Sequence, residues 1–81
     1  LNRYGICENE YKILLELQEN KCGICQTENP KGRHKIFHVD HNHNTEMIRG
    51  LLCDKCNRGL GFFDDNIKNL NRAVKYLKMY Q

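Results

Sequence analysis

The sequence of 81 residues lacks long hydrophobic runs, internal repeats and low-complexity stretches. No apolar segment approaches the roughly 18 residues that a bilayer-spanning helix needs, so a transmembrane protein is not expected. The N-terminus shows no signal-peptide pattern, and we therefore expect an intracellular protein. The chain begins with Leu rather than Met, which is compatible with a fragment or a processed chain.

A strong excess of one charge is also missing. Lys and Arg number 13 against 10 acidic residues, and the resulting net charge of +3 supports an anionic partner only weakly. The distribution is more informative, because basic residues gather in the central third and acidic residues in the N-terminal segment. The central group comprises Lys31, Arg33, His34, Lys35, Arg49, Lys55 and Arg58, and the N-terminal group comprises Glu8, Glu10, Glu16 and Glu19.

The chain is too short to be held together by a large core. A domain of this size buries only about 60% of the surface that its unfolded chain exposes, and such domains commonly depend on disulfides, a structural metal or a partner subunit. Five cysteines and four histidines favour one of the first two. We expect one domain over residues 1–81, with a core over 20–63 and flanking helices at about 8–20 and 65–80.

The terminal segments have helical patterns. Tyr11, Leu14, Leu15 and Gln18 recur at helical spacing and predict a helix over 8–20. Cys7 precedes it where a cap is expected, so we interpret Cys7 as a small buried or capping residue and not as a metal ligand. Near the C-terminus, Asp64, Asp65 and Asn66 offer caps, followed by Ile67, Leu70, Val74, Leu77 and Tyr80 at helical spacing. We expect both helices to pack against the central module.

Between the helices the pattern predicts a hairpin and a short helix. The runs 34–40 and 47–52 are rich in residues that favour strands, and the polar loop 41–46 joins them. From Cys53 onward we expect a short helix that ends near Gly59 or Gly61. The predicted class is therefore α+β.

Two Cys-x-x-Cys pairs predict a metal site. Each pair, Cys22–Cys25 and Cys53–Cys56, can direct two thiolates at one ion, and together they form the sulfur set of structural zinc. A disulfide framework is disfavoured by the odd cysteine count and the absent secretory signal, and a thioredoxin-like role by the lack of a βαβ setting. Because four thiolates close the shell, this zinc is expected to be structural.

The segment His38-Val39-Asp40-His41-Asn42-His43 predicts a second, different site. On a strand, His38 and Asp40 share a face, His41 lies at the exit, and Asn57 follows Cys56 directly. Carboxylate and carboxamide oxygens suit Mg²⁺ or Mn²⁺, and a neutral imidazole beside them can accept a proton from water. These are the parts that phosphodiester hydrolysis requires.

Other interpretations of this segment stay open on the residues alone. A strand histidine such as His38 is more often structural than in contact with substrate, and His34 is expected at the surface. Ligand count also permits a second zinc site built from His38, Asp40, His41 and His43. Without further information, a hydrolase and a purely structural zinc module are about equally compatible with the sequence.

A family resemblance bears on this choice. Cys22-x-x-Cys25, His-Val-Asp-His-Asn-His at 38–43, Ile-Arg-Gly-Leu-Leu-Cys at 48–53 and Cys-Asn-Arg-Gly-Leu-Gly at 56–61 resemble the phage recombination endonuclease VII family. That family belongs to the HNH, or His-Me finger, nucleases. The resemblance covers most of the chain and implies a ββα-metal module with a treble-clef-like zinc centre, in a phage- or prophage-encoded DNA endonuclease working inside the host cell.

The resemblance also implies roles for individual residues. Asp40 and Asn57 would bind the catalytic Mg²⁺ or Mn²⁺, His41 would be the general base, and His43 would assist. Arg49, Lys55 and Arg58 are candidate phosphate contacts on duplex or branched DNA, argued from charge and neighbourhood only. Cleavage would leave 5′-phosphate and 3′-hydroxyl ends.

The chain also departs from part of the family pattern. Members that resolve branched DNA work as dimers built partly from helices beyond this module, so a homodimer, junction resolution and simple nicking all stay open. The alternative from another class is a non-catalytic zinc-finger module that binds DNA or protein.

Overall fold

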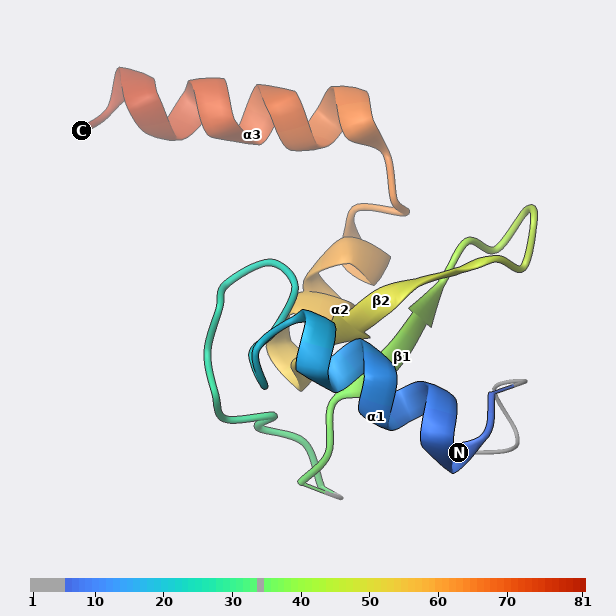
Figure 1. Cartoon of the computed structure of the whole chain (residues 1–81). Coiled ribbons are helices and arrows are strands. Elements are labelled where there is room, and N and C mark those ends of the chain that lie inside the picture. Colours follow the sequence, from blue (N-terminus) through green and yellow to red (C-terminus); the bar gives the residue numbers. More distant parts are fainter. Residues whose placement is uncertain (1–5, 34) are drawn as a thin grey trace.

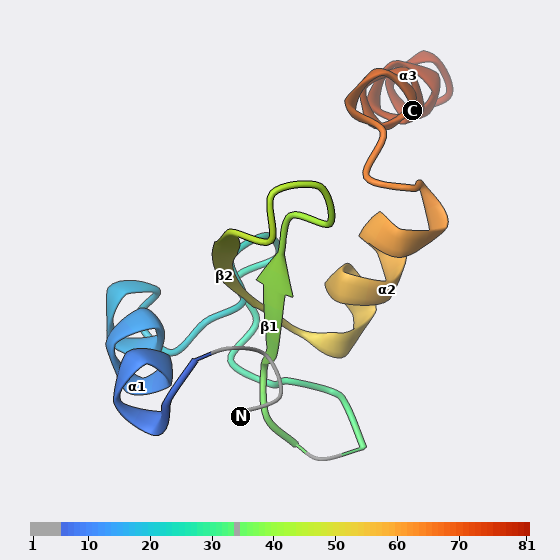
Figure 2. The same ribbon diagram turned by 90° about the vertical axis from the view of Figure 1, so that its right-hand side faces the viewer.

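The described part of the chain forms a hairpin enclosed between two helices, with a third helix set apart. The computed structural model describes residues 6–33 and 35–81, so His34 lies outside the described residues. Its elements are α1 (Glu8–Leu17), β1 (His38–His41), β2 (Ile48–Leu52), α2 (Asp54–Phe62) and α3 (Ile67–Met79). Helix α1 lies on one side of the hairpin and α2 on the other, while α3 projects beyond α2 (Figures 1 and 2).

Helix α1 begins where the sequence predicts and ends earlier. Cys7 is its N-cap, and the Glu10 carboxylate accepts a hydrogen bond from the Cys7 N–H at 3.4 Å. Cys7 is exposed, so it is a capping residue and not a buried one. The predicted helix over 8–20 stops at Leu17, because Glu19 and Asn20 have φ of 56° and 61° and turn the chain into the left-handed region.

The core lies between α1 and the hairpin. The buried residues are Ile6, Tyr11, Cys22, Phe37, Val39, Leu51, Leu52 and Cys53. Leu14 and Leu15 of α1 pack against them, as the helical spacing predicts. The Tyr11 hydroxyl donates to the Phe37 carbonyl at 3.0 Å and so attaches α1 to the segment entering β1. Two cysteines of the predicted metal set, Cys22 and Cys53, are among the buried residues and so belong to the core.

The hairpin is antiparallel and contains a bulge. Val39 pairs with Leu51 and Asp40 with Gly50, but His41 pairs with Ile48, which leaves Arg49 as an extra residue on β2. A bulge of this kind redirects the side chain of the extra residue. The strands are shorter than the predicted runs 34–40 and 47–52: β1 begins only at His38, since bends precede it, and β2 begins at Ile48.

The free edge of β2 is covered by side-chain and loop groups. The Gln18 amide accepts from the Leu51 N–H at 2.8 Å and donates to the Leu51 carbonyl at 2.9 Å, as a neighbouring strand would. The Gly23 N–H also donates to that carbonyl at 3.0 Å. Gly50 gives Gln18 the room to approach, because a Cβ there would lie 2.8 Å from the Gln18 Oε1. Helix α1 and the first cysteine pair are thereby attached to the hairpin.

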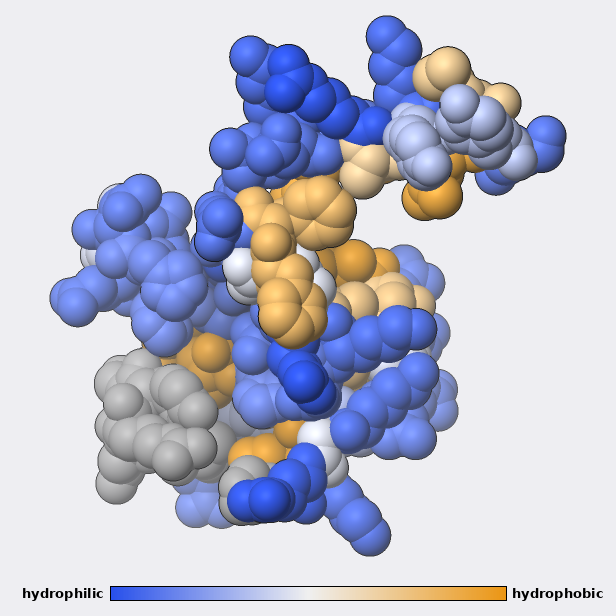
Figure 3. Space-filling view, turned by 180° about the vertical axis from the view of Figure 1, so that it is seen from behind, coloured by the Kyte–Doolittle hydropathy of each residue, from blue (hydrophilic) through white to orange (hydrophobic). Residues whose placement is uncertain are grey.

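The C-terminal helix does not pack as expected. Helix α3 begins after Asn66, whose side chain accepts from the Asn69 N–H at 2.8 Å, as one of the predicted caps should. None of residues 67–79, all of them described, is buried, and Ile67 and Leu77 are 74% and 63% exposed. Figure 3 shows hydrophobic residues at the surface along this helix and at the end of α2. Leu70 of this helix lines a hollow with Cys25, Cys56 and Leu60, so the expected packing against the central module is limited to the start of α3, because the turn at 63–66 carries the helix away from α2.

No helix among the described residues combines the length and apolarity that a membrane crossing demands.

Replacing Gln18 by Ala tests the edge contacts. The change leaves the partly buried Leu51 N–H without its acceptor, and we expect a loss of about 1–3 kcal/mol in the free energy of unfolding. Urea denaturation of Gln18→Ala measures this loss. Glu16→Ala, an exposed position of the same helix, is the matched control and should change stability by less than about 0.5 kcal/mol. Equal stability of both variants would show that the amide contributes nothing to the edge.

Candidate functional site

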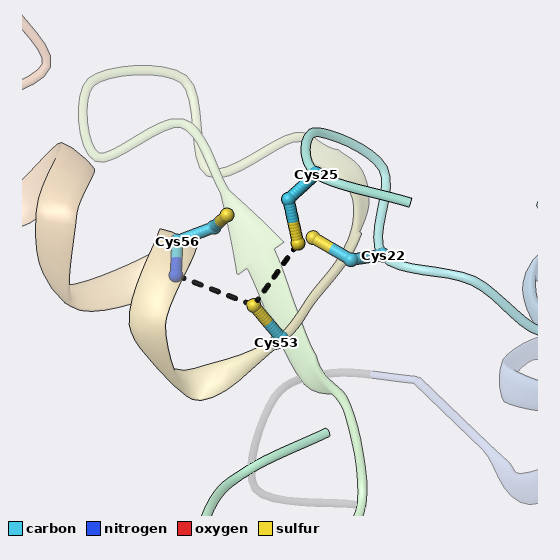
Figure 4. A group of neighbouring side chains, drawn as sticks. All are labelled: Cys22, Cys25, Cys53 and Cys56. Carbon is cyan, nitrogen blue, oxygen red and sulfur yellow. Dashed lines mark hydrogen bonds between the residues drawn. The ribbon is translucent and has the colours of Figure 1, made fainter. Parts of the chain in front are cut away.

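Four cysteine sulfur atoms converge on one point. The Sγ atoms of Cys22, Cys25, Cys53 and Cys56 all lie within 4.8 Å of one another, and those of Cys25 and Cys53 are 3.7 Å apart (Figure 4). A tetrahedral zinc site with bonds of about 2.3 Å sets its sulfur atoms about 3.8 Å apart. The cluster therefore fits a structural zinc ion once the more distant sulfur atoms move closer together. The four residues are those that the two Cys-x-x-Cys pairs predict.

Local backbone geometry aims each cysteine pair at this point. In the first pair, the Ile24 N–H donates to the Cys22 sulfur at 3.4 Å, and Gln26 closes the loop with a left-handed φ of 63°. In the second pair, the Cys53 sulfur accepts from the Cys56 N–H at 3.4 Å and caps α2. Cys53 thus directly follows β2, caps α2 and belongs to the cluster.

The thiols are electrostatically linked. Burial raises the pKa of Cys22, but the backbone amides of Cys53, Ile24 and Cys25 outweigh burial and lower that pKa to about 6. Burial and the neighbouring sulfur atoms, first that of Cys53, raise the pKa of Cys56 to about 12. The thiolate of Cys22 therefore forms more readily than that of Cys56, as expected when like charges share a small space. A divalent cation among the sulfur atoms would offset that repulsion.

A second group of polar side chains lines a hollow between the hairpin and α2. Its volume is about 250 Å³. The predicted residues Asp40, His41, His43 and Asn57 all line it, so strand, loop and helix contribute to one site. The lining is completed by His38, Val39, Leu60, Gly61 and Asp65. The sequence segments that contain these residues are up to 27 positions apart, and the fold brings them together.

Asp40 is held by an arginine. Both carboxylate oxygens accept from Arg49, Oδ2 from Nε at 2.7 Å and Oδ1 from Nη2 at 2.9 Å. The same Nη2 donates to Asp65 Oδ2 at 3.2 Å. Hydrogen bonding to Asp40 raises the pKa of the Arg49 guanidinium, and the charges of Asp40 and Asp65 act in the same direction. The sequence predicts Arg49 as a phosphate contact, and the structure places it on the carboxylate of the site instead.

The two histidines after Asp40 lie side by side. His41 is the last residue of β1, and its ring centroid is 5.3 Å from that of His43, with the planes tilted by 59°. The Asn42 carboxamide oxygen shapes the turn that carries His43, since it accepts from the N–H groups of Asn44 and Thr45 at 2.8 and 3.1 Å. His43 is thus positioned to contact His41 or a molecule that His41 binds.

Asn57 reaches the hollow from α2. It follows Cys56 within the first turn, and its N–H donates to the Cys53 carbonyl at 3.0 Å. The backbone of Asn57 is therefore attached to the cysteine cluster, as the sequence predicts. Of the predicted phosphate contacts, Lys55 is exposed on the same helix.

An acidic residue between the second pair of cysteines anchors the remaining histidine. His38 Nε2 lies 3.0 Å from Asp54 Oδ1, which supports the structural interpretation of His38 while leaving its ring at the edge of the hollow. Arg58, another predicted phosphate contact, lies 3.5 Å from Asp54 Oδ2 with most of its side chain exposed. Sequence reasoning missed Asp54 and also Asp65, which it interpreted only as a cap. Nothing in the local spacing of either residue points to the site.

A second zinc site is not supported. Among the residues that the structure describes, the four cysteines are the only group of three or more metal-ligating side chains whose ligand atoms converge. His38, Asp40, His41 and His43 do not form such a group, because His38 turns to Asp54 and Asp40 to Arg49.

A hairpin followed by a helix is the arrangement of the ββα-Me class of folds, and in this chain a four-cysteine cluster lies at the junction of the two. Comparison with solved structures agrees. The crystal structure of the ββα-Me type II restriction endonuclease Hpy99I superposes with a TM-score of 0.66 and 34% sequence identity, over 93% of this chain and 43% of that one. The predicted α+β, ββα-metal fold is confirmed.

The chain belongs to the recombination endonuclease VII family, whose sequence model matches residues 1–79. It is 46% identical over 79 residues to the gene 59 protein of Mycobacterium phage D29 and 45% identical over 78 residues to that of Mycobacterium phage L5. These matches cover 96% and 95% of this chain but 47% and 46% of the phage proteins, so the chain spans about half the length of these relatives. The predicted family resemblance is confirmed.

Measurement of bound metal tests the cysteine cluster. We expect about one zinc ion per chain, and removal of zinc by a strong chelator should unfold the domain, because metal binding and folding are coupled. Atomic absorption and circular dichroism measure the two effects. Cys56→Ser should lose zinc, whereas the matched variant Cys7→Ser, at an exposed cap, should retain it. A native spectrum after verified zinc removal, or loss of zinc in Cys7→Ser, would contradict this ligand set.

Proposed function

We propose that this chain is a divalent-metal-dependent DNA endonuclease domain that hydrolyses phosphodiester bonds. The observation that carries the proposal is the meeting of Asp40, His41 and Asn57 at one hollow beside the cysteine cluster. Membership of the endonuclease VII family and the likeness to a ββα-Me restriction endonuclease support it. In this proposal, zinc at the cysteine cluster is structural and takes no part in the reaction.

The donor set of the hollow fits a hard cation. Asp40 supplies carboxylate oxygens and Asn57 a carboxamide oxygen, and Mg²⁺ and Mn²⁺ prefer such ligands and retain several waters. A hollow of about 250 Å³ leaves room for those waters. When bound, the cation would neutralise charge on the phosphate and on the departing 3′-oxygen. Asp40 and Asn57 would hold it, once Arg49 releases the carboxylate.

The remaining groups would direct the water and the phosphate. His41 accepts a proton from a water molecule. The oxygen of this water attacks the phosphorus opposite the 3′-oxygen, and the bond between phosphorus and the 3′-oxygen breaks. His43, next to His41, orients the phosphate or the His41 ring. Asp54 keeps His38 turned to α2 and away from the attacking water. The products carry 5′-phosphate and 3′-hydroxyl ends.

The DNA partner is supported by the charge of α3. This helix contains Lys68, Arg72, Lys75 and Lys78 and no acidic residue, and the first three repeat at spacings that place them on one face. All four are exposed. Together with the exposed Lys55 and Arg58 on α2, they give the domain basic groups that can contact phosphates.

Cleavage of plasmid DNA tests the proposed base. With Mg²⁺, the parent protein should nick or linearise supercoiled plasmid, and His41→Ala should be slower by about 10²- to 10⁴-fold. Asn44→Ala, on the exposed turn after β1, is the matched control and should retain activity. Equal rates for His41→Ala and the parent, at equal zinc content, would remove His41 from the mechanism. If all variants bind DNA and none cleaves it, the domain is a non-catalytic zinc module.

Salt dependence tests the contribution of α3 to DNA binding. In a His41→Ala background, which prevents cleavage, the triple change of Lys68, Arg72 and Lys75 to Gln should weaken duplex binding. The slope of log Kd against log salt should fall by about one for each phosphate that the protein no longer neutralises. The control triple of Lys12, Lys21 and Lys35 to Gln removes the same charge elsewhere. Equal weakening by the two triples would mean that only net charge matters and that α3 does not touch the DNA.

A further inference from the structure

Arg49 binds the carboxylate of Asp40, which the proposed function assigns to a cation. Its Nε and Nη2 groups bind the two oxygens of Asp40 at 2.7 and 2.9 Å, so the pair is bidentate. The Asp40 side chain is only 12% exposed. A carboxylate with so little access to water needs a compensating positive charge, and Arg49 provides it. The guanidinium therefore binds the carboxylate that the cation would bind and carries a single positive charge there.

This arrangement creates a conflict that the site must resolve. A divalent cation on Asp40 and a guanidinium bidentate to the same carboxylate would be two positive groups a few ångströms apart, which repel each other. A cation that binds Asp40 therefore favours a position of Arg49 farther from this carboxylate. Another anion nearby would stabilise the displaced guanidinium, whose side chain is 36% exposed.

Asp65 is that anion. Its Oδ2 accepts from Arg49 Nη2 at 3.2 Å, so one guanidinium group already bridges the two aspartates. Asp65 lines the same hollow, and its side chain is 26% exposed. Its backbone is fixed, since its N–H donates to the Leu60 carbonyl at 2.9 Å and its φ is 54°. Aspartate tolerates this left-handed conformation better than most residues.

We propose that Asp65 is a positioning residue that takes over Arg49 from Asp40 when a divalent cation binds. A small rotation of the guanidinium about Nη2 keeps the contact with Asp65 and frees Oδ2 of Asp40, which Nε now binds, for the cation. The released Nε–H of Arg49 can then donate to a phosphate oxygen beside Asp40. Arg49 would thus balance the negative charge of Asp40 when no cation is bound, and it would contact a phosphate when a cation is bound. This inference rests on the proposed function, because it assumes that Asp40 binds the cation.

Manganese binding tests the exchange without any measurement of cleavage. Dissociation constants for Mn²⁺ are measured on the zinc-loaded protein by the paramagnetic resonance of free Mn²⁺. Arg49→Gln removes the competing charge and should tighten binding by about three- to tenfold. Asp65→Asn leaves Arg49 with Asp40 alone and should weaken binding by a few-fold. Asp64→Asn removes the same charge one residue away and is the matched control, expected to match the parent.

The double variant separates the proposed role from a simpler one. In Arg49→Gln/Asp65→Asn, the second change should have little further effect, because Asp65 acts only through Arg49. If Asp65→Asn weakens Mn²⁺ binding equally in both backgrounds, Asp65 is a direct ligand and the exchange is wrong. If Arg49→Gln leaves Mn²⁺ affinity unchanged, Arg49 does not compete for Asp40 and the inference fails.

Two further measurements make these outcomes unambiguous. Asp40→Asn should abolish the specific Mn²⁺ site, and if it binds Mn²⁺ as the parent does, the proposed function fails before the exchange is considered.

Thermal unfolding guards against misfolding: Mn²⁺ should raise the melting temperature of Arg49→Gln more than that of the parent, because the uncompensated Asp40 gains more from the cation. An equal rise in both proteins would count against the exchange.

Discussion

The convergence of four thiols is the constraint on which the rest of this small domain depends. Cys25 and Cys53 are 28 positions apart in the chain, yet their sulfur atoms lie 3.7 Å apart. Closing so long a loop costs conformational entropy, which the small core between α1 and the hairpin offsets only in part. A metal ion among the sulfur atoms would add the missing stability and would hold the ends of the intervening hairpin together.

The cysteine cluster fixes the relative position of the elements that form the candidate active site. Cys53 directly follows β2 and caps α2, and Asn57 lies one turn further on, so the helix that lines the hollow is fixed relative to the strand that lines it. On the strand side, the bulge at Arg49 brings a guanidinium onto Asp40. The hollow therefore contains a carboxylate already matched to a positive charge, together with two adjacent imidazoles. This environment is polar and charged, and it is a poor one for an apolar ligand.

The errors of the sequence-based predictions have physical causes. Periodicity cannot foresee that Glu19 and Asn20 adopt left-handed φ, so the predicted first helix is three residues too long. An amphipathic pattern in α3 implies that its apolar side is covered, but not by which molecule, and the turn at 63–66 directs the helix away from the body. Asp54 and Asp65 gain their partners from β1 and β2, at separations of 16 residues, which no local pattern encodes.

What the sequence determined by itself was local chemistry: the sulfur ligands, the hairpin with its following helix, and the group of Asp40, His41 and Asn57. The first two follow from spacing, because a Cys-x-x-Cys pair and a short strand restrict side-chain direction over a few residues, and the third follows from the family resemblance. The tertiary structure alone decided which charges meet in the hollow. A bulge moved Arg49 onto Asp40, and a turn beyond α2 placed Asp65 against it, since such contacts depend on distances between elements and not on the order of residues within one.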